Sequence, residues 1–510
     1  MQNSIAQIIT DAAQRYTNKT ALIIGDQQFS YERLDTLSNQ VANSLVAIGV
    51  SPGDRVTLYG ANAWEWVVSY YGILKTGAVV NPINVMLTPE EVAFVVEDCG
   101  AKAIIASKEK GLPLIGLETR TSIEKLILYG EDIPVGATSF EHLIEEAPED
   151  FISPLIDPDS LSTICYTSGT TGKPKGAMLS HKAVITNCTM TALMHGRCEQ
   201  DVVVTALPCP HVYGNVVMNG CFQNGGMLVL HSVFELEQVL NSIEKHSATV
   251  FDGVPTMYMY MLESPTIDKR DLSSLRLCAV GGQTMPPAKM KQVEDKFQCP
   301  LVELWGMTEL AGLGTTFAHN GDYRHGSIGV SLPYTQAKII NTKDAAIEMP
   351  TGEAGELLIK GHIVMQGYFG NEAGTREVLS EDGWLRTGDV ACIDASGFIT
   401  IVDRIKDMIL TSGYNIYPAE IENVIASHPN VALVAVGPIP DELKGELAKA
   451  YIILKQGTNP SAENIVSFCR EHLAAYKVPR DVQFVDDLPK TSTGKIMRRE
   501  LIKLHNLQQT

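Results

Sequence analysis

The sequence predicts an α/β protein: a large N-terminal region of layered α/β subdomains plus a β-rich subdomain, followed by a small α+β C-terminal domain. From about residue 20 to 320, short apolar runs alternate with amphipathic helical patterns, which is typical of parallel α/β layers. Between about 326 and 402 the pattern changes to short strands separated by glycines. Beyond Asp403 a new α+β pattern begins. A chain of 510 residues also exceeds the size of one growing core, so at least two domains are expected.

Three strand–helix pairs define the large region. They are 55–59 with 63–76, 248–251 with 255–262, and 275–280 with 286–297. Pro286 and Pro287 suit the first turn of the last helix, where a missing N–H costs nothing. Each pair predicts one strand of a parallel sheet and the helix that covers it.

The C-terminal unit is expected to hold a helix, two strands and a second helix. Their predicted ranges are 418–426, 431–436, 448–454 and 462–473. The boundary falls within 403–407, between a strand and the new pattern, so the predicted domains are 1–403 and 404–510.

The composition limits the partners of the chain. A formal net charge of −19 argues against nucleic acid and anionic membranes, which bind through Lys and Arg. The ten cysteines are scattered, with no C-x-x-C pair, and are expected to be reduced thiols. The first 13 residues lack a signal-peptide pattern, and no stretch nears the roughly 18 apolar residues of a membrane span. We therefore expect a cytoplasmic protein without a transmembrane segment.

A loop rich in glycine and hydroxyl groups follows the apolar stretch 161–165. Its glycines allow backbone N–H groups to approach an anion, its hydroxyls can donate to phosphate oxygens, and Lys173 and Lys175 add positive charge. Pro174 after Lys173 excludes the common P-loop pattern. A flexible linker is the alternative. The candidate phosphate-binding residues are Thr167, Ser168, Gly169, Thr170, Thr171, Gly172 and Lys175.

This loop resembles the signature loop of the adenylate-forming enzymes, which include acyl- and aryl-CoA synthetases, peptide-synthetase adenylation domains and beetle luciferases. Further motifs resemble those of the family almost to the C-terminus. The resemblance implies ATP, Mg²⁺ and CoA as cofactor and co-substrates, with an acyl-adenylate formed first and a thioester second. Positive charge and metal must mask the repulsion when a carboxylate attacks the α-phosphorus of ATP.

A second motif, residues 305–309, follows the short strand 301–304, where open α/β sheets bind ligands. By resemblance Thr308 contacts phosphate, Glu309 binds Mg²⁺ and Trp305 stacks on adenine. Gly306 and Met307 belong to the same nucleotide site. The alternative for Glu309 is a solvated loop acid.

Two further segments complete the implied nucleotide site. Gly281, Gly282 and Gln283 resemble the segment that lines the adenine and acyl pockets, although a plain strand-to-helix connection would look similar. Asp389 and Arg404, fifteen residues apart, match the two ribose contacts of the family.

The C-terminal unit carries the groups for the two half-reactions. Lys495 resembles the adenylation lysine, which can reach the α-phosphate and the substrate carboxylate; the alternative is a solvated basic tail, since Arg498 and Arg499 follow. The family resemblance also makes the small domain mobile about a hinge at Lys406.

In the second half-reaction the resemblance implies a thiol tunnel lined by Ser412, Gly413 and Tyr414. His211 matches an aromatic gate on that tunnel. A lone histidine that satisfies local hydrogen bonds is the equal alternative.

The sequence says less about the carboxylic acid. Gly306 stands where small-acid relatives carry a bulky aromatic residue, so acetate is not the expected substrate. No carboxylate occurs in 211–217, which weakens an amino-acid substrate. Apolar residues around the inferred pocket suit a hydrocarbon chain or an aryl ring, and these are Val216, Val217, Met218, Cys221, Met257, Leu310 and Leu313.

We expect an acid:CoA ligase for a medium- or long-chain fatty acid. The alternatives are an aryl-acid:CoA ligase, an adenylating enzyme with another acceptor such as a carrier protein, and an ATP-binding sensor without catalysis. The expected partners are the small-molecule acid, ATP and CoA, with a homodimer left open.

Overall fold

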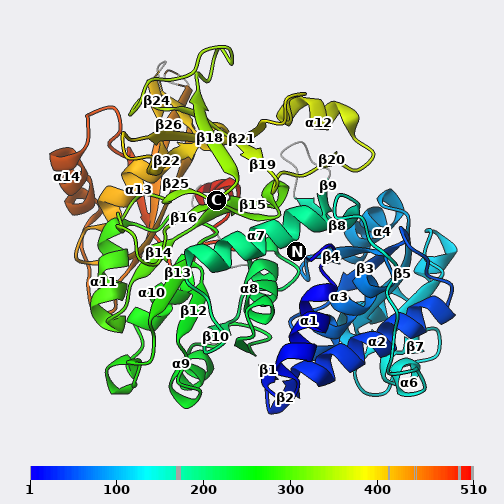
Figure 1. The fold of residues 1–510 in the computed structure, drawn as a ribbon. Coiled ribbons are helices and arrows are strands. Elements are labelled where there is room, and N and C mark those ends of the chain that lie inside the picture. The colour runs from blue at the N-terminus through cyan, green and yellow to red at the C-terminus, as the bar shows by residue number, and fades with distance from the viewer. Residues whose placement is uncertain are drawn as a thin grey trace.

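The computed structural model describes residues 2–167, 174–411, 414–441, 443, 445–491 and 496–506. Two large sheets, of seven and eight strands, form the body of the molecule (Figure 1). The helix α7 (His181–Met194) crosses the centre of the view between them, with α8 (Val212–Gln223) packed against it. The C-terminal unit, orange in Figure 1, lies beside α11 (Pro287–Phe297).

The seven-stranded sheet is parallel except at its last strand. Its order is β14 (Leu301–Glu303), β13 (Leu277–Val280), β12 (Val250–Gly253), β10 (Val202–Thr205), β11 (Met227–Leu230), β1 (Thr20–Ile24) and β2 (Gln27–Ser30). Strands β12, β13 and β14 are wholly buried, as expected of apolar strands with helices on both faces. Their carboxyl ends bring the segments after 253, 280 and 303 to one edge.

The eight-stranded sheet ends in an antiparallel hairpin. Its order is β20 (Gly367–Tyr368), β9 (Lys175–Ser180), β8 (Leu161–Thr167), β4 (Val79–Ile83), β3 (Arg55–Tyr59), β5 (Ala101–Ser107), β6 (Lys125–Tyr129) and β7 (Thr138–Ser139). Strands β8 and β9 pair antiparallel and flank 168–173, which lie outside the described residues. The two strands of this hairpin therefore flank the segment that is predicted to bind phosphate.

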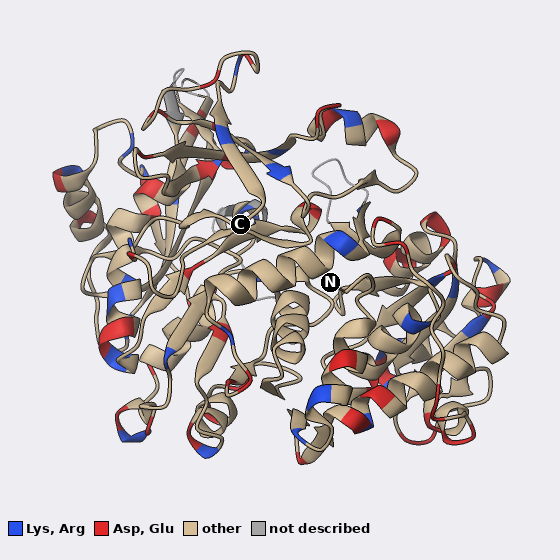
Figure 2. Ribbon diagram, viewed as in Figure 1, with Lys and Arg blue, Asp and Glu red and all other residues tan. Residues whose placement is uncertain are grey.

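Helices cover both sheets. Besides α7, α8 and α11 they are α1 (Gln7–Tyr16), α2 (Tyr31–Ala47), α3 (Trp64–Lys75), α4 (Pro89–Asp98), α5 (Lys108–Gly111), α6 (Phe140–Glu145), α9 (Leu236–Lys245), α10 (Pro255–Leu262) and α12 (Glu372–Val378). The predicted helices 63–76, 255–262 and 286–297 are confirmed to within a residue at each end. The charged residues lie mainly on the outer helices and loops, as the blue and red segments in Figure 2 show. Helices α7 and α8 at the centre contain almost none.

Residues 305–309 differ from the expected loop. Trp305–Met307 form a short strand, β15, that pairs antiparallel with β16 (Gly312–Thr316), and β16 pairs with β17 (Val330–Ser331). Thr308–Leu310 form a 3₁₀ turn that carries Glu309. Ala311 closes the hairpin in the left-handed region at φ 55°.

The β-rich subdomain is confirmed as a four-stranded antiparallel sheet. Its strands are β18 (Thr335–Ile340), β19 (Gly355–Gly361), β21 (Leu385–Ile393) and β22 (Ile399–Arg404). Asp389 pairs directly with Arg404 across β21 and β22, which gives the fifteen-residue spacing a structural cause.

The C-terminal unit has its own sheet and core. The strands are β23 (Ile409–Thr411), β24 (Tyr414–Ile416), β25 (Val431–Asp441), β26 (Gly445–Leu454) and β27 (Asp481–Phe484), with α13 (Pro418–Ala426), α14 (Ala462–His472) and α15 (Leu501–Asn506). Strands β25 and β26 are longer than predicted because they continue into a two-stranded hairpin. Within the described residues, each strand of this sheet pairs only with others of the unit. Among those residues no helix has the length and apolar character needed to cross a membrane. All ten cysteines are free thiols, eight of them buried.

Candidate active site

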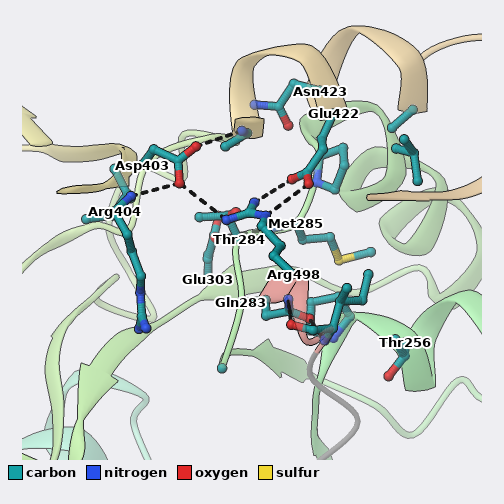
Figure 3. A pocket seen from close by; sticks show the side chains of 18 of the residues that line it. Thr256, Gln283, Thr284, Met285, Glu303, Asp403, Arg404, Glu422, Asn423 and Arg498 are labelled. Atoms are coloured by element: carbon teal, nitrogen blue, oxygen red, sulfur yellow. Dashed lines mark hydrogen bonds and ion pairs between the residues drawn. The ribbon is translucent and has the colours of Figure 1, made fainter. Parts of the chain in front are cut away.

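A cavity of about 580 Å³ lies between the large region and the C-terminal unit (Figure 3). Seven of the residues predicted from sequence line it: Gly282, Gln283, Trp305, Gly306, Asp389, Arg404 and Lys406. Thr491 and 496–498 line it from the C-terminal unit, on either side of 492–495, which lie outside the described residues. The cavity therefore joins motifs that are two hundred residues apart in the sequence.

Three of the predicted residues form one hydrogen-bonded group. Trp305 Nε1 donates to Asp389 Oδ2 at 2.7 Å, and Arg404 Nε lies 3.2 Å from Asp389 Oδ1. The Asp389 carboxylate is almost fully buried, whereas Arg404 keeps 40% of its side chain exposed. This arrangement presents an indole ring, a carboxylate and a guanidinium to one ligand.

Gln283 connects the large region to the loop that carries Lys495. Its amide oxygen accepts a hydrogen bond from Ile496 N at 2.9 Å, and its amide nitrogen donates to Ile496 O at 3.5 Å. Ile496 also forms an isolated bridge with Lys490. Lys495 lies outside the described residues, but the residue directly after it is fixed at the cavity.

Arg498 is the centre of a charged group at the cavity wall (Figure 3). Its guanidinium lies 2.6 Å from Glu422 on α13, and 3.3 Å from both Asp403 and Asp407. Burial alone would lower the pKa of Arg498, but the three carboxylates outweigh it and raise that pKa above its usual value. The interpretation of this stretch as a solvated basic tail is therefore wrong for Arg498.

Asp403 lies at the predicted boundary between the two domains. Its oxygens accept hydrogen bonds from Ala419 N at 2.8 Å and Arg404 N at 2.7 Å, besides the contact with Arg498. Burial raises the pKa of Asp403, and Arg498 acts in the opposite direction. Asp403, the last residue of the predicted large domain, is thus held by contacts with 404–510.

Glu303, which the sequence did not single out, also lines the cavity. It is buried at the end of β14, and burial raises its pKa to about 8. Met285 N donates to Glu303 Oε1 at 3.3 Å. Within the described residues Glu303 has no cationic partner, so its raised pKa favours the protonated form at neutral pH, a form that can donate a hydrogen bond.

We expect Glu303→Gln to change the pH dependence of stability. The folded pKa is raised above the ordinary value of 4.5, so between these two values the folded state binds one more proton than the unfolded state. Stability then falls as pH rises through this window, by up to roughly a few kcal/mol. The variant removes this loss. Its denaturation midpoint should match the wild type near pH 5 and exceed it near pH 8; equal midpoints at both would contradict the prediction.

A second group of residues lies beside 168–173. Tyr368 Oη donates to Glu309 Oε1 at 2.8 Å, and Lys175 Nζ lies 5.1 Å from the Tyr368 ring centroid. Thr167 Oγ1 donates to Lys175 O at 3.4 Å. Burial, followed by the charge of Glu309, raises the pKa of Tyr368. Tyr368 was missed because a Gly-Tyr pair in a short strand gives no local signal of this contact.

Glu309 suits a magnesium ion that is also held by a nucleotide. Its carboxylate is buried, and only Oε1 has a hydrogen-bond partner within the described chain. Those residues contain no group of three metal-binding side chains. Mg²⁺ commonly takes one or two carboxylates and completes its shell with water and substrate phosphates, so a single carboxylate fits.

The other predicted residues lie away from the cavity or outside the described chain. His211 is exposed and caps α8, where its Nδ1 accepts from Tyr213 N at 3.2 Å. Gly281 packs against Leu304, and Met307 and Thr308 belong to the β15–β16 hairpin. Tyr414 begins β24. Outside the described residues lie Ser168, Gly169, Thr170, Thr171, Gly172, Ser412, Gly413 and Lys495.

Gly306 does not simply leave room for a substrate. A Cβ atom there would lie 2.0 Å from Gly312 O and 2.7 Å from Leu313 Cα, which are backbone atoms of the paired strand. A larger residue must move the β15–β16 hairpin before it can fill any pocket. Position 306 therefore does not offer free space in the direction of a Cβ, although glycine there was expected to leave room for an acid larger than acetate.

A small chamber of about 20 Å³ lies deeper in the molecule and shares Leu304 with the main cavity. Four of the predicted apolar residues line it: Val216, Val217, Cys221 and Leu313. Met218, Met257 and Leu310 are buried but do not line it. Arg197 and Asp252 line it as well, so the expected apolar pocket has a charged end.

The fold and the cavity together define an adenylate-forming enzyme. Sheets and helices bring the Trp305 indole, the Asp389 carboxylate and the residues that flank 492–495 to one cavity, and Glu309 follows Trp305 by four residues. The chain belongs to the AMP-binding enzyme family: the family model for the AMP-binding enzyme matches residues 9–369, and the model for its C-terminal domain matches 420–495.

Relatives extend this assignment along the whole chain. The long-chain-fatty-acid–CoA ligase of Bacillus subtilis is 33% identical over 98% of this chain and 94% of its own length. The feruloyl-CoA synthase of Amycolatopsis sp is 34% identical, covering 94% and 95%. The crystal structure of the anthranilate CoA ligase AuaEII with anthranoyl-AMP matches with a TM-score of 0.93 and 30% identity over 100% of both chains. The chain is an AMP-forming acid:CoA ligase that uses an acid, ATP and CoA.

Proposed function

We propose that the preferred acid is a medium- or long-chain fatty acid. The observation that carries the assignment of the reaction is the cavity that joins the nucleotide motifs to the segment around Lys495. The apolar side chains of Val216, Val217 and Leu313, and the similarity to a long-chain ligase, support a hydrocarbon substrate.

In the first half-reaction, Trp305 with Gly281–Gln283 would hold the adenine, and Asp389 with Arg404 the ribose. Thr308 and the loop 167–175 would bind the phosphates, and Glu309 would hold Mg²⁺, oriented by Tyr368. Lys495 would then neutralise charge between the substrate carboxylate and the α-phosphate, so that the carboxylate oxygen attacks phosphorus and pyrophosphate leaves.

In the second half-reaction the C-terminal unit, 404–510, would rotate about Lys406 relative to 1–403. Ser412, Gly413 and Tyr414 would then line the thiol path, with His211 as its gate. The hydrogen bonds between Gln283 and Ile496, and the contacts of Asp403 with Ala419 and Arg498, would break during this rotation, whereas the Arg498–Glu422 contact would move with the unit. The CoA thiol attacks the acyl carbonyl, and AMP leaves. We also propose that the protein is cytoplasmic and that it can form a homodimer.

An aryl acid is the second candidate, because a compact ring would displace fewer side chains than a long chain. About 20 Å³ holds roughly one water molecule, so a long chain would need side chains to move. The named relatives include a feruloyl-CoA synthase and an anthranilate CoA ligase.

The test is pyrophosphate release from ATP over a panel of fatty, aryl and amino acids, each with and without CoA. We expect release with fatty acids and thioester formation when CoA is present, and loss of both when Mg²⁺ is chelated. Selective release with aryl acids would favour the second candidate. Release that no CoA concentration converts to thioester would point to a carrier protein.

A further inference from the structure

Two charged side chains from distant parts of the sequence meet at the wall of the small chamber. Arg197 lies in the loop between α7 and β10, and Asp252 lies in β12. Their side chains are 9% and 1% exposed, and Arg197 Nη2 donates to Asp252 Oδ2 at 2.8 Å. Asp252 and Asp201 more than offset the effect of burial on the pKa of Arg197, so this guanidinium stays charged. A full ion pair is therefore buried at a site where the sequence predicts hydrocarbon.

The hydrogen-bonding capacity of this pair is largely unused. A guanidinium carries several N–H donors, and within the described chain the Nη2–Asp252 contact is the one side-chain hydrogen bond that Arg197 makes. Among the residues that the structure describes, the other oxygen of Asp252, Oδ1, has only the long 3.4 Å contact from Tyr213 Oη. Because both residues line the chamber, donors and an acceptor remain available from it.

The pair is not needed to anchor the loop. Arg276 already holds the same loop from outside the chamber, through Asp201 Oδ2 at 2.6 Å and Gly196 O at 3.0 Å. A buried ion pair commonly stabilises a protein no more than apolar residues of similar volume would. Stability alone therefore gives no strong reason for a charged pair at this place.

The chamber fits one small polar group. About 20 Å³ corresponds to roughly one water molecule. The ion pair has no net charge, so a second carboxylate would be desolvated there without compensation. A hydroxyl can accept from Arg197 and donate to Asp252 Oδ1, and a carbonyl oxygen can accept from Arg197.

We propose that Arg197 and Asp252 select an acid that carries a neutral hydroxyl or carbonyl oxygen at the end remote from its carboxylate. The inference rests on the proposed function, since it places the far end of the acid at this chamber. The proposal narrows the substrate class to hydroxy or oxo acids, whether the organic part of the acid is a chain or a ring.

The test compares matched acids of equal length on the full-length protein, by pyrophosphate release: unsubstituted, hydroxylated or oxidised to a ketone at the far end, and dicarboxylic. We expect kcat/KM for the hydroxy or oxo acid to exceed that of the plain acid about 10- to 100-fold. The double variant Arg197→Met/Asp252→Leu, which leaves no unpaired buried charge, should lose or reverse this ratio. The control pair Arg276→Gln/Asp201→Asn, which borders the same loop outside the chamber, should keep it.

A wild-type preference for the plain acid, or a ratio that the double variant leaves unchanged, overturns the proposal. A preference for the dicarboxylic acid overturns it too, because the site would then recognise an anion. If no acid supports pyrophosphate release, the proposed function fails. Calorimetric binding of the same acids then decides the inference separately, since equal affinity for the plain and hydroxy acids contradicts it.

Discussion

Lys495→Ala should lower adenylate formation by about a thousandfold or more, yet leave thioester formation from a supplied acyl-adenylate near the wild-type rate. The ammonium group can offset negative charge between the carboxylate and the α-phosphate only in the first half-reaction. Ile496, its neighbour, is held at the cavity by Gln283. Pyrophosphate release measures the first step, and CoA consumption with synthetic acyl-adenylate measures the second.

Lys490→Ala is the matched control in the same loop. Its ammonium group contacts Asp487 and Tyr260 rather than the cavity. It should leave adenylate formation within a few-fold of wild type. An equal loss of both half-reactions in Lys495→Ala would show that this lysine acts in folding or docking and not in the chemistry of one step.

Arg498→Met should destabilise the arrangement in which the cavity forms. Removing one partner from a buried charged group costs about 3–5 kcal/mol, because Asp403, Asp407 and Glu422 would be left without their cation. Adenylate formation should fall by about tenfold or more, while thioester formation from supplied adenylate falls less. Urea unfolding and the two half-reaction assays measure these effects.

Arg470→Met serves as the control, since Arg470 is exposed on α14 in the same unit. It should change neither stability nor rate appreciably. If Arg498→Met kept wild-type adenylation and stability, the charged group would be a surface feature with no part in positioning the loop. Arg498→Lys keeps the charge but loses the planar guanidinium. Its stability and adenylation rate should lie between those of the wild type and Arg498→Met.

Much of the fold could be predicted because its signals are local. Apolar runs followed by amphipathic patterns gave strands and helices such as β3 and α3, and Pro287 marked the first residue of α11. The spacing of Asp389 and Arg404 has a local cause as well, since they face each other across adjacent antiparallel strands.

The parts that could not be predicted depend on contacts between distant segments. In the sequence nothing distinguishes Arg197 from an ordinary loop residue. Only the fold shows that β12 places Asp252 beside it. The sequence likewise suggests that Arg498 is a solvated base. In the fold, three carboxylates from α13 and the domain boundary surround it. Direction matters too: only the backbone geometry shows that a side chain at Gly306 would point at Gly312 O.

The link between Gln283 and Ile496 has a consequence for how the two parts recognise each other. Both hydrogen bonds join a side-chain amide to the main chain of Ile496, so the side chain at 496 takes no part in them. Recognition here depends on where the backbone runs, not on which residue occupies it. These two hydrogen bonds would therefore survive a change of side chain at position 496, except to proline, which has no N–H to donate.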